Sequence, residues 1–456
     1  MRDMKRTRSL TPVDHDRAIA GPGITFFLPR VVSLWLLLGL LVPVTQAQDS
    51  WTSFQNGGPY DASAELTTTF DWKKIFENSW EIKLKGYGQS SPVCWQGHVY
   101  TTYVSGKNKD RCGVLAHRIK DGTLAWEISQ PNPSPRESNV YVSKAAPTPV
   151  LDAQGITVLF EGGLLFSCGH DGKLRWKRDL RKQYGVIKTN HGLASSLEQS
   201  VDSIFVWIER SDDPYLLSVD KATGKNRWKV HGIDATTWAS PRLVPVGNQK
   251  HLVLSGIGKL VGIDPGTGRK LWEFDGVSGN STPTPMPVGD GLFLMGATVG
   301  SRNTGGTTAH ESNGLVRITP RGQQEFEVAY VWHCQRATSS FGSPIACGKM
   351  AYFVNRSGIL FAVDLKTGKE VYSRRLSASL WATPLRVDNS LLFACKNGTV
   401  QVIATGPTYR KLGQHEAWKS TEGPPRGGRS VLYAAIAVDK SIILRRGDLL
   451  IGYRLP

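Results

Sequence analysis

Three aromatic side chains occupy matched positions in the chain and could form a surface on which a ligand stacks. Trp238, Phe341 and Trp381 each lie three residues before a proline, in the strings WASP, FGSP and WATP. Aromatic rings in a concave site stack on sugars, peptides and planar ligands. The same rings could instead cap a channel or pack beneath loops, and the sequence leaves both interpretations open.

A second candidate set is basic and lies mostly in long segments at 104–112, 128–145, 177–194, 296–313 and 413–429. The net charge is +17, and a basic surface attracts anionic polymers or acidic membrane surfaces. A solvated surface without a partner would give the same pattern. The candidate binding residues of this set are Arg136, Lys144, Arg178, Arg181, Tyr184, His191, Arg302, His310, Arg426, Arg429 and Arg445.

Motifs of enzyme chemistry do not occur in the sequence. It contains no H-E-x-x-H, G-x-S-x-G or P-loop string, and its ten histidines show no metal-ligand spacing. Gly256 and Gly258 form a fragment of a nucleotide-binding fingerprint without the helix that should follow. We therefore expect a non-catalytic protein without a cofactor or metal site.

The elements that would position the candidate side chains follow from a repeat. Tryptophan recurs after turns of the type Asp-x-x-Thr-Gly, as in VDKATGKNRW and IDPGTGRKLW, which end at Trp228 and Trp272. Pairs such as Ser240-Pro241 and Thr282-Pro283 precede the β-rich runs of the copies. A spacing of about 40 to 60 residues between such landmarks is typical of propeller blades.

Each copy has the pattern of four short antiparallel strands joined by turns that contain glycine, and helical periodicity is almost absent. The last copy lacks a fourth strand, whereas SWEIKL at 79–84 has a fourth-strand pattern with no strands before it. We predict an all-β fold, an eight-bladed β-propeller of four-stranded blades, in which 79–84 completes the last blade.

In this fold the repeat aromatics would pack between neighbouring blades rather than hold a cofactor. First strands line the central channel of a propeller, so Trp238, Phe341 and Trp381 would lie at one channel mouth. Second-to-third loops and blade-to-blade segments share one end of the ring, which we call the loop face. The predicted inter-blade residues are Trp80, Trp126, Trp176, Trp228, Trp272, Trp332 and Tyr372.

The repeat resembles the PQQ-like β-propeller repeat, in the eight-bladed form of the BamB-type outer-membrane assembly factors. The resemblance covers 79–456 and is most specific at 220–228 and 264–272, while WTSFQNGG at 51–58 resembles the start of exported proteins of this class. It implies an exported scaffold that binds a protein partner or an envelope polymer through the loop face.

Two alternatives are a propeller that binds anionic polysaccharide and a PQQ-dependent oxidoreductase. PQQ-dependent oxidoreductases of this repeat class carry a pair of adjacent cysteines, and this sequence lacks such a pair. The assembly factors that this repeat resembles carry a lipidation cysteine after the leader, and this sequence lacks that cysteine as well.

Residues 1–47 are predicted to form a signal peptide, followed by a lead-in segment at 48–78 and the propeller at 79–456. The apolar run at 31–44 is shorter than the roughly 20 residues that span a bilayer, and Thr45 and Ala47 fit a cleavage site. An uncleaved anchor is the alternative. We expect a periplasmic or secreted monomer with no nucleic-acid partner and no stable membrane span after cleavage.

The six cysteines permit disulfides in an oxidising compartment, with Cys94–Cys112 and Cys334–Cys347 as the nearest pairs. They could equally be small buried hydrophobic residues of strands.

Overall fold

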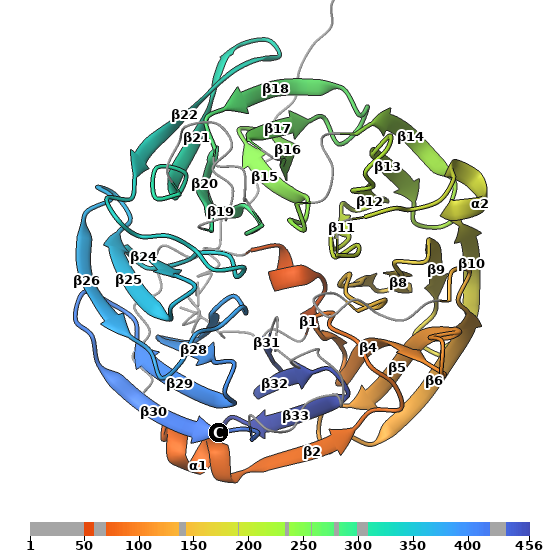
Figure 1. Cartoon of the computed structure of the whole chain (residues 1–456), viewed down its shortest axis with the longest axis horizontal. Coiled ribbons are helices and arrows are strands. Elements are labelled where there is room, and N and C mark those ends of the chain that lie inside the picture. Colours follow the sequence, from red (N-terminus) through yellow and green to blue (C-terminus); the bar gives the residue numbers. More distant parts are fainter. Residues whose placement is uncertain are drawn as a thin grey trace, which may run out of the picture. The chain divides into compact units, whose positions relative to one another are not determined.

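The structure is a computed structural model that describes residues 50–58, 70–135, 143–189, 191–232, 237–256, 258–277, 282–298, 309–419 and 435–456. The predicted signal peptide lies outside these residues. Within 46–456, eight antiparallel sheets stand around a central axis as the blades of a ring (Figure 1). The predicted all-β, eight-bladed propeller is therefore confirmed.

The first four blades each contain four strands that follow one another in the chain, and a short extra strand joins the first blade on its inner side. The first blade contains β1 (Ser50–Trp51), β3 (Val93–Trp95), β4 (His98–Ser105), β5 (Arg111–Arg118) and β6 (Leu124–Pro131). The second contains β7 (Val150–Asp152), β8 (Gly155–Leu159), β9 (Leu164–Cys168) and β10 (Leu174–Asp179). The third contains β11 (Glu198–Gln199), β12 (Ser203–Ile208), β13 (Tyr215–Asp220) and β14 (Asn226–His231). The fourth contains β15 (Arg242–Val246), β16 (Gln249–Ser255), β17 (Lys259–Ile263) and β18 (Lys270–Asp275).

The other four blades follow the same order, except that the last takes its outer strand from the N-terminal side of the chain. The fifth blade contains β19 (Met286–Gly289), β20 (Leu292–Met295), β21 (Gly314–Gly322) and β22 (Glu325–His333). The sixth contains β23 (Ile345–Cys347), β24 (Met350–Val354), β25 (Ile359–Asp364) and β26 (Glu370–Arg375). The seventh contains β27 (Leu385–Val387), β28 (Ser390–Ala394), β29 (Thr399–Ala404) and β30 (Lys411–Glu416). The eighth contains β31 (Ala435–Val438), β32 (Ser441–Arg446), β33 (Leu449–Arg454) and β2 (Ser79–Lys83).

The strand β2 closes the ring as predicted. It pairs with β33 in an antiparallel register that places Trp80 opposite Gly452. Leu84, which was predicted as the last residue of this strand, lies just beyond it and donates its backbone N–H to the carbonyl of Asp448 at 2.7 Å. The pairing removes the free edge that β33 would otherwise present to solvent.

Neighbouring blades are joined by a contact between an outer-strand tryptophan and the next blade's third-to-fourth turn. The indole N–H of Trp228, for example, donates to the carbonyl of Pro265 at 3.0 Å, and the ring lies against Gly268. Gly268 has φ +78°, a conformation that glycine adopts without strain. Four other predicted inter-blade residues make the same indole-to-carbonyl contact: Trp80, Trp126, Trp176 and Trp332.

The remaining two predicted inter-blade residues are placed differently. The fifth blade has no Asp-x-x-Thr-Gly turn, because β21 and β22 form a long hairpin at this position. Trp272 therefore donates to Nδ1 of His251 in its own blade at 2.9 Å, and Phe326 of β22 packs edge-on against that imidazole. Tyr372 is partly buried against a core cluster that includes Leu391 and Phe393 of the seventh blade.

The lead-in segment contains two short helices as well as β1. The helix α1 (Trp72–Glu77) buries Trp72, Ile75 and Phe76 against β30 and β33, on the outside of the seam between the seventh and eighth blades (Figure 1). The 3-10 helix η1 (Phe54–Gly57) lies instead at the centre of the ring. The sequence did not predict these two positions.

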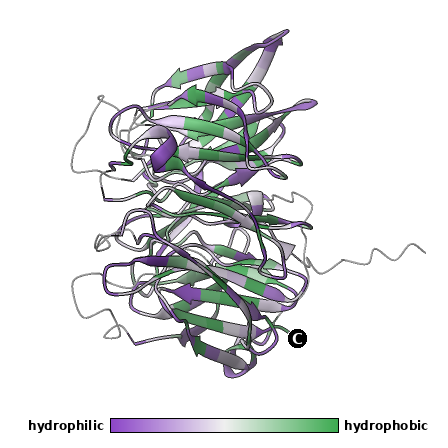
Figure 2. Cartoon of the chain, turned by 90° about the vertical axis from the view of Figure 1, so that its right-hand side faces the viewer, coloured by the Kyte–Doolittle hydropathy of each residue, from purple (hydrophilic) through white to green (hydrophobic). Residues whose placement is uncertain are grey.

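Many strand residues are apolar, as the green parts of the blades in Figure 2 show, and the apolar residues of the inner and middle strands are largely buried. All six cysteines are buried within this core. Cys94, Cys112 and Cys334 are free thiols, so neither of the two nearest sequence pairs forms a disulfide. In the portion of the chain that is described, no helix has the length and apolar character needed to cross a membrane.

Candidate functional site

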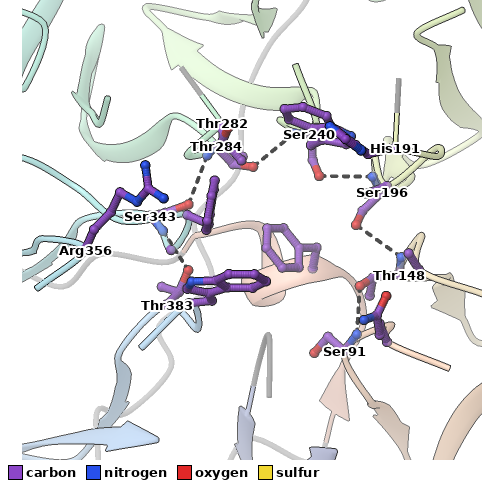
Figure 3. A pocket seen from close by; sticks show the side chains of 18 residues that line it. Ser91, Thr148, His191, Ser196, Ser240, Thr282, Thr284, Ser343, Arg356 and Thr383 are labelled. Atoms are coloured by element: carbon purple, nitrogen blue, oxygen red, sulfur yellow. Dashed lines mark hydrogen bonds between the residues drawn. The ribbon is translucent and has the colours of Figure 1, made fainter. Parts of the chain in front are cut away.

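A cavity of about 410 Å³ opens at the centre of the ring and collects side chains from several blades (Figure 3). Its lining includes all three of the aromatic residues singled out in the sequence, Trp238, Phe341 and Trp381. They belong to the segments that lead into the first strands of the fourth, sixth and seventh blades. We call this cavity the axial pocket.

A ring of hydroxyl groups surrounds the axial pocket. All ring residues except the last, Thr383, donate their backbone N–H to the hydroxyl oxygen of the corresponding residue in the next blade, over distances of 2.9 to 3.1 Å (Figure 3). The chain of hydrogen bonds links seven blades and explains the recurring Ser/Thr-Pro pairs, since proline ends the hydrogen-bonded segment and begins the strand. Its members are Ser91, Thr148, Ser196, Ser240, Thr284, Ser343 and Thr383.

One assignment made from the sequence is wrong in detail. The landmark of the fifth copy was taken as Thr282-Pro283, but the residue that receives the hydrogen bond from Ser240 is Thr284. The string Ser-Thr-Pro-Thr-Pro offers two candidates, and only the position of Ser240 in space distinguishes them. Thr282 still lines the pocket.

The aromatic side chains form two groups at the pocket. Phe341 and Trp381 meet edge to face, with ring centroids 4.8 Å apart and an interplanar angle of 81°. Trp238 lies with His191, at a centroid distance of 5.9 Å, and its indole N–H donates to the carbonyl of Gly192 at 3.1 Å. All four side chains are partly exposed.

Trp238 is held in an unusual backbone conformation. Its φ is +63°, in the left-handed region that residues with a side chain seldom adopt. The preceding residue, Thr237, is fixed by Glu209, whose Oε1 lies 3.2 Å from its backbone nitrogen and 3.0 Å from its hydroxyl oxygen. Strain of this kind persists where surrounding contacts determine the conformation, and it is common at binding sites.

Glu209 is fully buried, and burial raises its pKa to about 8. The Thr237 hydroxyl oxygen also lies 2.9 Å from the carbonyl of Ser255, which can only accept. The backbone N–H and the hydroxyl of Thr237 donate to Oε1 of Glu209, and these hydrogen bonds oppose the effect of burial on its pKa. Burial is the larger effect, so the raised pKa favours a neutral carboxyl group at the residue that fixes Thr237, next to Trp238.

The N-terminal segment supplies a further wall of the pocket that the sequence did not reveal. Phe54 lines the cavity, and its carbonyl accepts a hydrogen bond of 3.0 Å from Arg242. The next two residues, Gln55 and Asn56, have φ values of +54° and +49°, and Gln55 donates to the hydroxyl of Thr383. Contacts from several blades hold this left-handed turn at the ring axis. The string WTSFQNGG indicated only a resemblance to the start of exported proteins with this repeat.

Two cations lie on the aromatic faces at the mouth of the pocket. The guanidinium carbon of Arg356 is 5.6 Å from the centroid of Phe341, and Nζ of Lys396 is 4.1 Å from the centroid of Trp381. Both come from second-to-third loops, between β24 and β25 and between β28 and β29. Antiparallel strands alternate in direction, so these loops and the blade-to-blade segments lie at the same end, and the pocket opens on the loop face.

Arg356 and Lys396 were not among the candidate residues. Each lies in a short turn before a glycine, at Arg356-Ser357-Gly358 and Lys396-Asn397-Gly398. The matching position of these two turns in adjacent copies was the signal that could have identified them.

Those of the predicted loop-face residues that the structure describes do not form one surface. Of these, His191 lines the axial pocket. Lys144 is buried in an ion pair with Glu161 at 2.6 Å. Arg445 is also buried, where it donates to the Ser90 hydroxyl at 2.6 Å, and burial lowers its pKa to about 9. Lys144 and Arg445 are thus structural residues of the interior, because the blade contacts use their donors, and the expectation of an exposed position is wrong for both.

Three further candidates form a local cluster on the second blade. Arg178 donates to Asn226 at 2.7 Å and to the hydroxyl of Tyr184 at 3.1 Å, and Arg181 donates to the carbonyl of Pro133 at 2.9 Å. These contacts tie the helix α2 (Leu180–Tyr184) to neighbouring segments. His310 is partly buried beside β21. The other four predicted residues lie outside the described residues: Arg136, Arg302, Arg426 and Arg429.

The pocket does not fit the cofactor set of the quinone-dependent enzymes that share this superfold. Among the residues that the structure describes, its lining contains no aspartate or glutamate, and oxygen ligands of that kind are what Ca²⁺ requires. No group of three His, Cys, Asp or Glu side chains among the described residues is arranged to hold a metal ion. The lining offers aromatic faces, hydroxyls and cations instead, which suit binding.

The geometry defines a class of protein, a PQQ-like propeller with a pocket on its axis. The family model described as "Outer membrane protein assembly factor BamB" matches residues 212–445, and the chain belongs to this family. No curated protein matches it in sequence.

Solved structures of this fold are similar to the chain at low identity. BamB from Moraxella catarrhalis has a TM-score of 0.55 at 12% identity and covers 82% of this chain and 96% of its own. The quinohemoprotein alcohol dehydrogenase from Comamonas testosteroni has a TM-score of 0.56 at 10% identity, and the match covers 90% of this chain and 82% of the dehydrogenase chain. The computationally designed Ika8 protein has a TM-score of 0.54 at 12% identity, and the match covers 82% of this chain and 98% of the Ika8 chain. At these identities the likeness concerns the fold alone.

Proposed function

We propose that this protein is a non-catalytic, exported binding protein that holds an extended segment of a partner protein at the loop face, with the axial pocket as its centre. The observation that carries the proposal is the pocket itself, where aromatic rings from three blades converge and the described lining residues include no carboxylate that could act as an acid or base. Large rigid aromatic side chains are the residues on which protein interfaces depend most.

The family supports this proposal because the matching model describes an assembly factor for outer membrane proteins. Such a role needs a rigid scaffold that presents a binding face rather than a reaction centre. The blades supply that rigidity, since the hydroxyl ring joins the first seven and the indole of Trp80 joins the eighth to the first. An exported, envelope-located protein is consistent with the expected leader.

The proposal is tested by site-directed photo-crosslinking in the cells that make the protein. A benzophenone amino acid replaces Phe341 in the pocket, and the matched control replaces Leu174, which is 43% exposed on the outer strand β10. We expect a protein adduct from position 341 that is lost when Trp381→Ala is added, and none from position 174. Equal adducts at both positions, or none at position 341, would contradict the proposal.

The second candidate, an anionic polysaccharide, is favoured by one observation, the cations Arg356 and Lys396 on the faces of Phe341 and Trp381. Binding to immobilised acidic polysaccharide that falls steeply with added salt would support it. Loss of that binding in Trp381→Ala would locate it at the pocket.

A further inference from the structure

The end of the ring opposite the loop face carries a set of exposed cations. We call this end the turn face, because the third-to-fourth and first-to-second turns of the blades lie there together. Two lysines of these turns are paired, Lys173 with Asp171 at 3.0 Å and Lys221 with Asp152 at 2.9 Å. Six further basic side chains of the third-to-fourth turns are exposed and make no ion pair within the described part of the chain: Lys120, Lys225, Arg269, Lys366, Lys369 and Arg410.

The aspartates of the same turns are bound to the turn backbone. Oδ1 of Asp121 accepts the backbone N–H of Thr123 at 2.9 Å, and Oδ1 of Asp264 accepts that of Gly266 at 2.8 Å. The aspartates that begin the turns of the third and sixth blades make the same contact. In the third-to-fourth turns basic residues outnumber acidic ones, so this end of the ring presents cations to an anionic surface.

Exposed apolar side chains lie on the same face. Leu124 and Leu174 follow the third-to-fourth turns of the first and second blades, as the first residues of β6 and β10, and are 53% and 43% exposed. Val201, in the first-to-second turn of the third blade, is 97% exposed. These three blades are neighbours in the ring (Figure 1). Apolar side chains among lysines and arginines are typical of surfaces that bind the interface of an anionic membrane, whereas a soluble polyanion would use the cations alone.

The chain also reaches the ring at the turn face. Ser50, which begins β1, lies opposite Trp95, and Trp95 is the last residue of β3 before the first-to-second turn of the first blade. The apolar run 31–44 precedes Ser50 in the sequence, and residues 45–49 can span at most about 20 Å. A run held in a bilayer, the alternative to cleavage, would therefore keep the turn face close to the lipid.

We propose that the turn face binds the surface of an anionic phospholipid membrane. The exposed lysines and arginines contact the lipid phosphates, and Leu124, Leu174 and Val201 enter the interface. Because the unpaired cations are spread over five blades around the ring, they suit an extended charged surface better than a single small ligand. The inference does not depend on the proposed function, since it concerns the end of the ring opposite the opening of the axial pocket.

The test identifies the face that contacts lipid. A fluorophore sensitive to its environment is attached to the full-length protein at Val201→Cys on the turn face, or at Val186→Cys as the matched control. Val186 is 42% exposed in the segment after α2 on the loop face, and the six native cysteines are buried. Vesicles of phosphatidylcholine and phosphatidylglycerol carry a brominated lipid that quenches a label in the interface. We expect quenching at position 201 that is reversed by salt, and none at position 186.

Charge variants measure the contribution of the cations. The turn-face variant combines Lys225→Gln, Arg269→Gln and Lys366→Gln. Its control removes the same charge from exposed loop-face positions: Lys107→Gln, Lys182→Gln and Lys188→Gln. Because each cation near an anionic surface contributes about a factor of five, the turn-face variant should raise the lipid concentration for half-maximal quenching at position 201 by about a hundredfold. The control should change it by less than about threefold.

The contrary outcomes are equally defined. Quenching at position 186 instead of 201, or at neither position, would overturn the inference. Equal effects of the two charge variants would overturn it as well, because net charge and not the turn face would then control binding. Binding of an oligogalacturonate that is lost in the turn-face variant, without quenching at position 201, would reassign the surface to an anionic polymer. The adduct at position 341 reports on the proposed function separately.

Discussion

The contact between Trp228 and Gly268 gives a quantitative prediction about what holds the blades together. A Cβ at position 268 would lie 2.8 Å from Cδ2 and 2.9 Å from Cε3 of the Trp228 ring, and 3.0 Å from Cγ1 of Val230. These distances are too short for carbon atoms, so Gly268→Ala must displace the ring. The substitution also forces alanine to adopt φ +78°.

The expected cost has three parts. The left-handed backbone costs about 1–2 kcal/mol for a residue with a Cβ. Displacing the indole sacrifices its hydrogen bond to Pro265, worth about 1 kcal/mol, and overpacking adds about 1–3 kcal/mol. Gly268→Ala should therefore lower the free energy of unfolding by about 3–6 kcal/mol.

A control within the same chain isolates the contact. Gly247 has φ +59°, and a Cβ there would meet no atom within 4 Å. Gly247→Ala should therefore cost only the backbone part, about 1–2 kcal/mol. Equilibrium urea unfolding followed by circular dichroism measures both variants. The double variant Trp228→Ala/Gly268→Ala should be less destabilised than the sum of its single changes, because the clash disappears with the ring.

The reasoning would be refuted if Gly268→Ala and Gly247→Ala shifted the unfolding midpoint equally. It would then follow that the Trp228 ring moves without cost and that the blades are held by other contacts. Trp228→Ala alone, which truncates a large packed side chain, should cost about 3–5 kcal/mol.

Three further perturbations have defined outcomes. Deleting 79–84 should expose the edge of β33 and give aggregates in size-exclusion chromatography, and a monomer with an unchanged melting temperature would contradict the closure by β2. The folded state keeps the Glu209 proton to about pH 8, whereas the unfolded chain releases it near pH 4.5. The free energy of unfolding should therefore fall as the pH rises between these values. Glu209→Gln should flatten this part of the pH profile, measured by urea unfolding. Arg242→Ala should cost about 3–5 kcal/mol by leaving Glu198 buried without its partner at 3.2 Å, whereas Arg242→Met with Glu198→Leu should recover most of the loss in the same assay.

The scaffold could be predicted from the sequence because each repeat is specified by interactions between residues close together in the chain. Turns of the Asp-x-x-Thr-Gly type specify a backbone geometry within five residues, as the hydrogen bond of 2.9 Å from the Thr223 amide to Asp220 shows. The fourth-strand pattern at 79–84 identified the closing strand for the same reason. Spacing relative to proline also grouped Trp238, Phe341 and Trp381, which line one pocket in the structure.

The polar partners of the site were beyond prediction because they depend on contacts between distant parts of the chain. Lys144 and Arg445 have the sequence context of exposed loop residues, yet each is buried by a partner in another strand or segment. Phe54 reaches the pocket only because β1 pairs with β3 and η1 turns toward the axis. Charge in a loop segment therefore did not reveal whether that charge faces solvent.

The pairing of β2 with β33 has a consequence for how the molecule can be made. Trp80 lies opposite Gly452, so the contact that completes the ring joins residues from nearly opposite ends of the described chain. During synthesis β2 emerges early and has no partner until the eighth blade has formed. Contacts between residues so far apart in sequence are slow to form. Closure is therefore expected as the late, rate-limiting event of folding, and until it occurs the first and last blades both remain open to other chains.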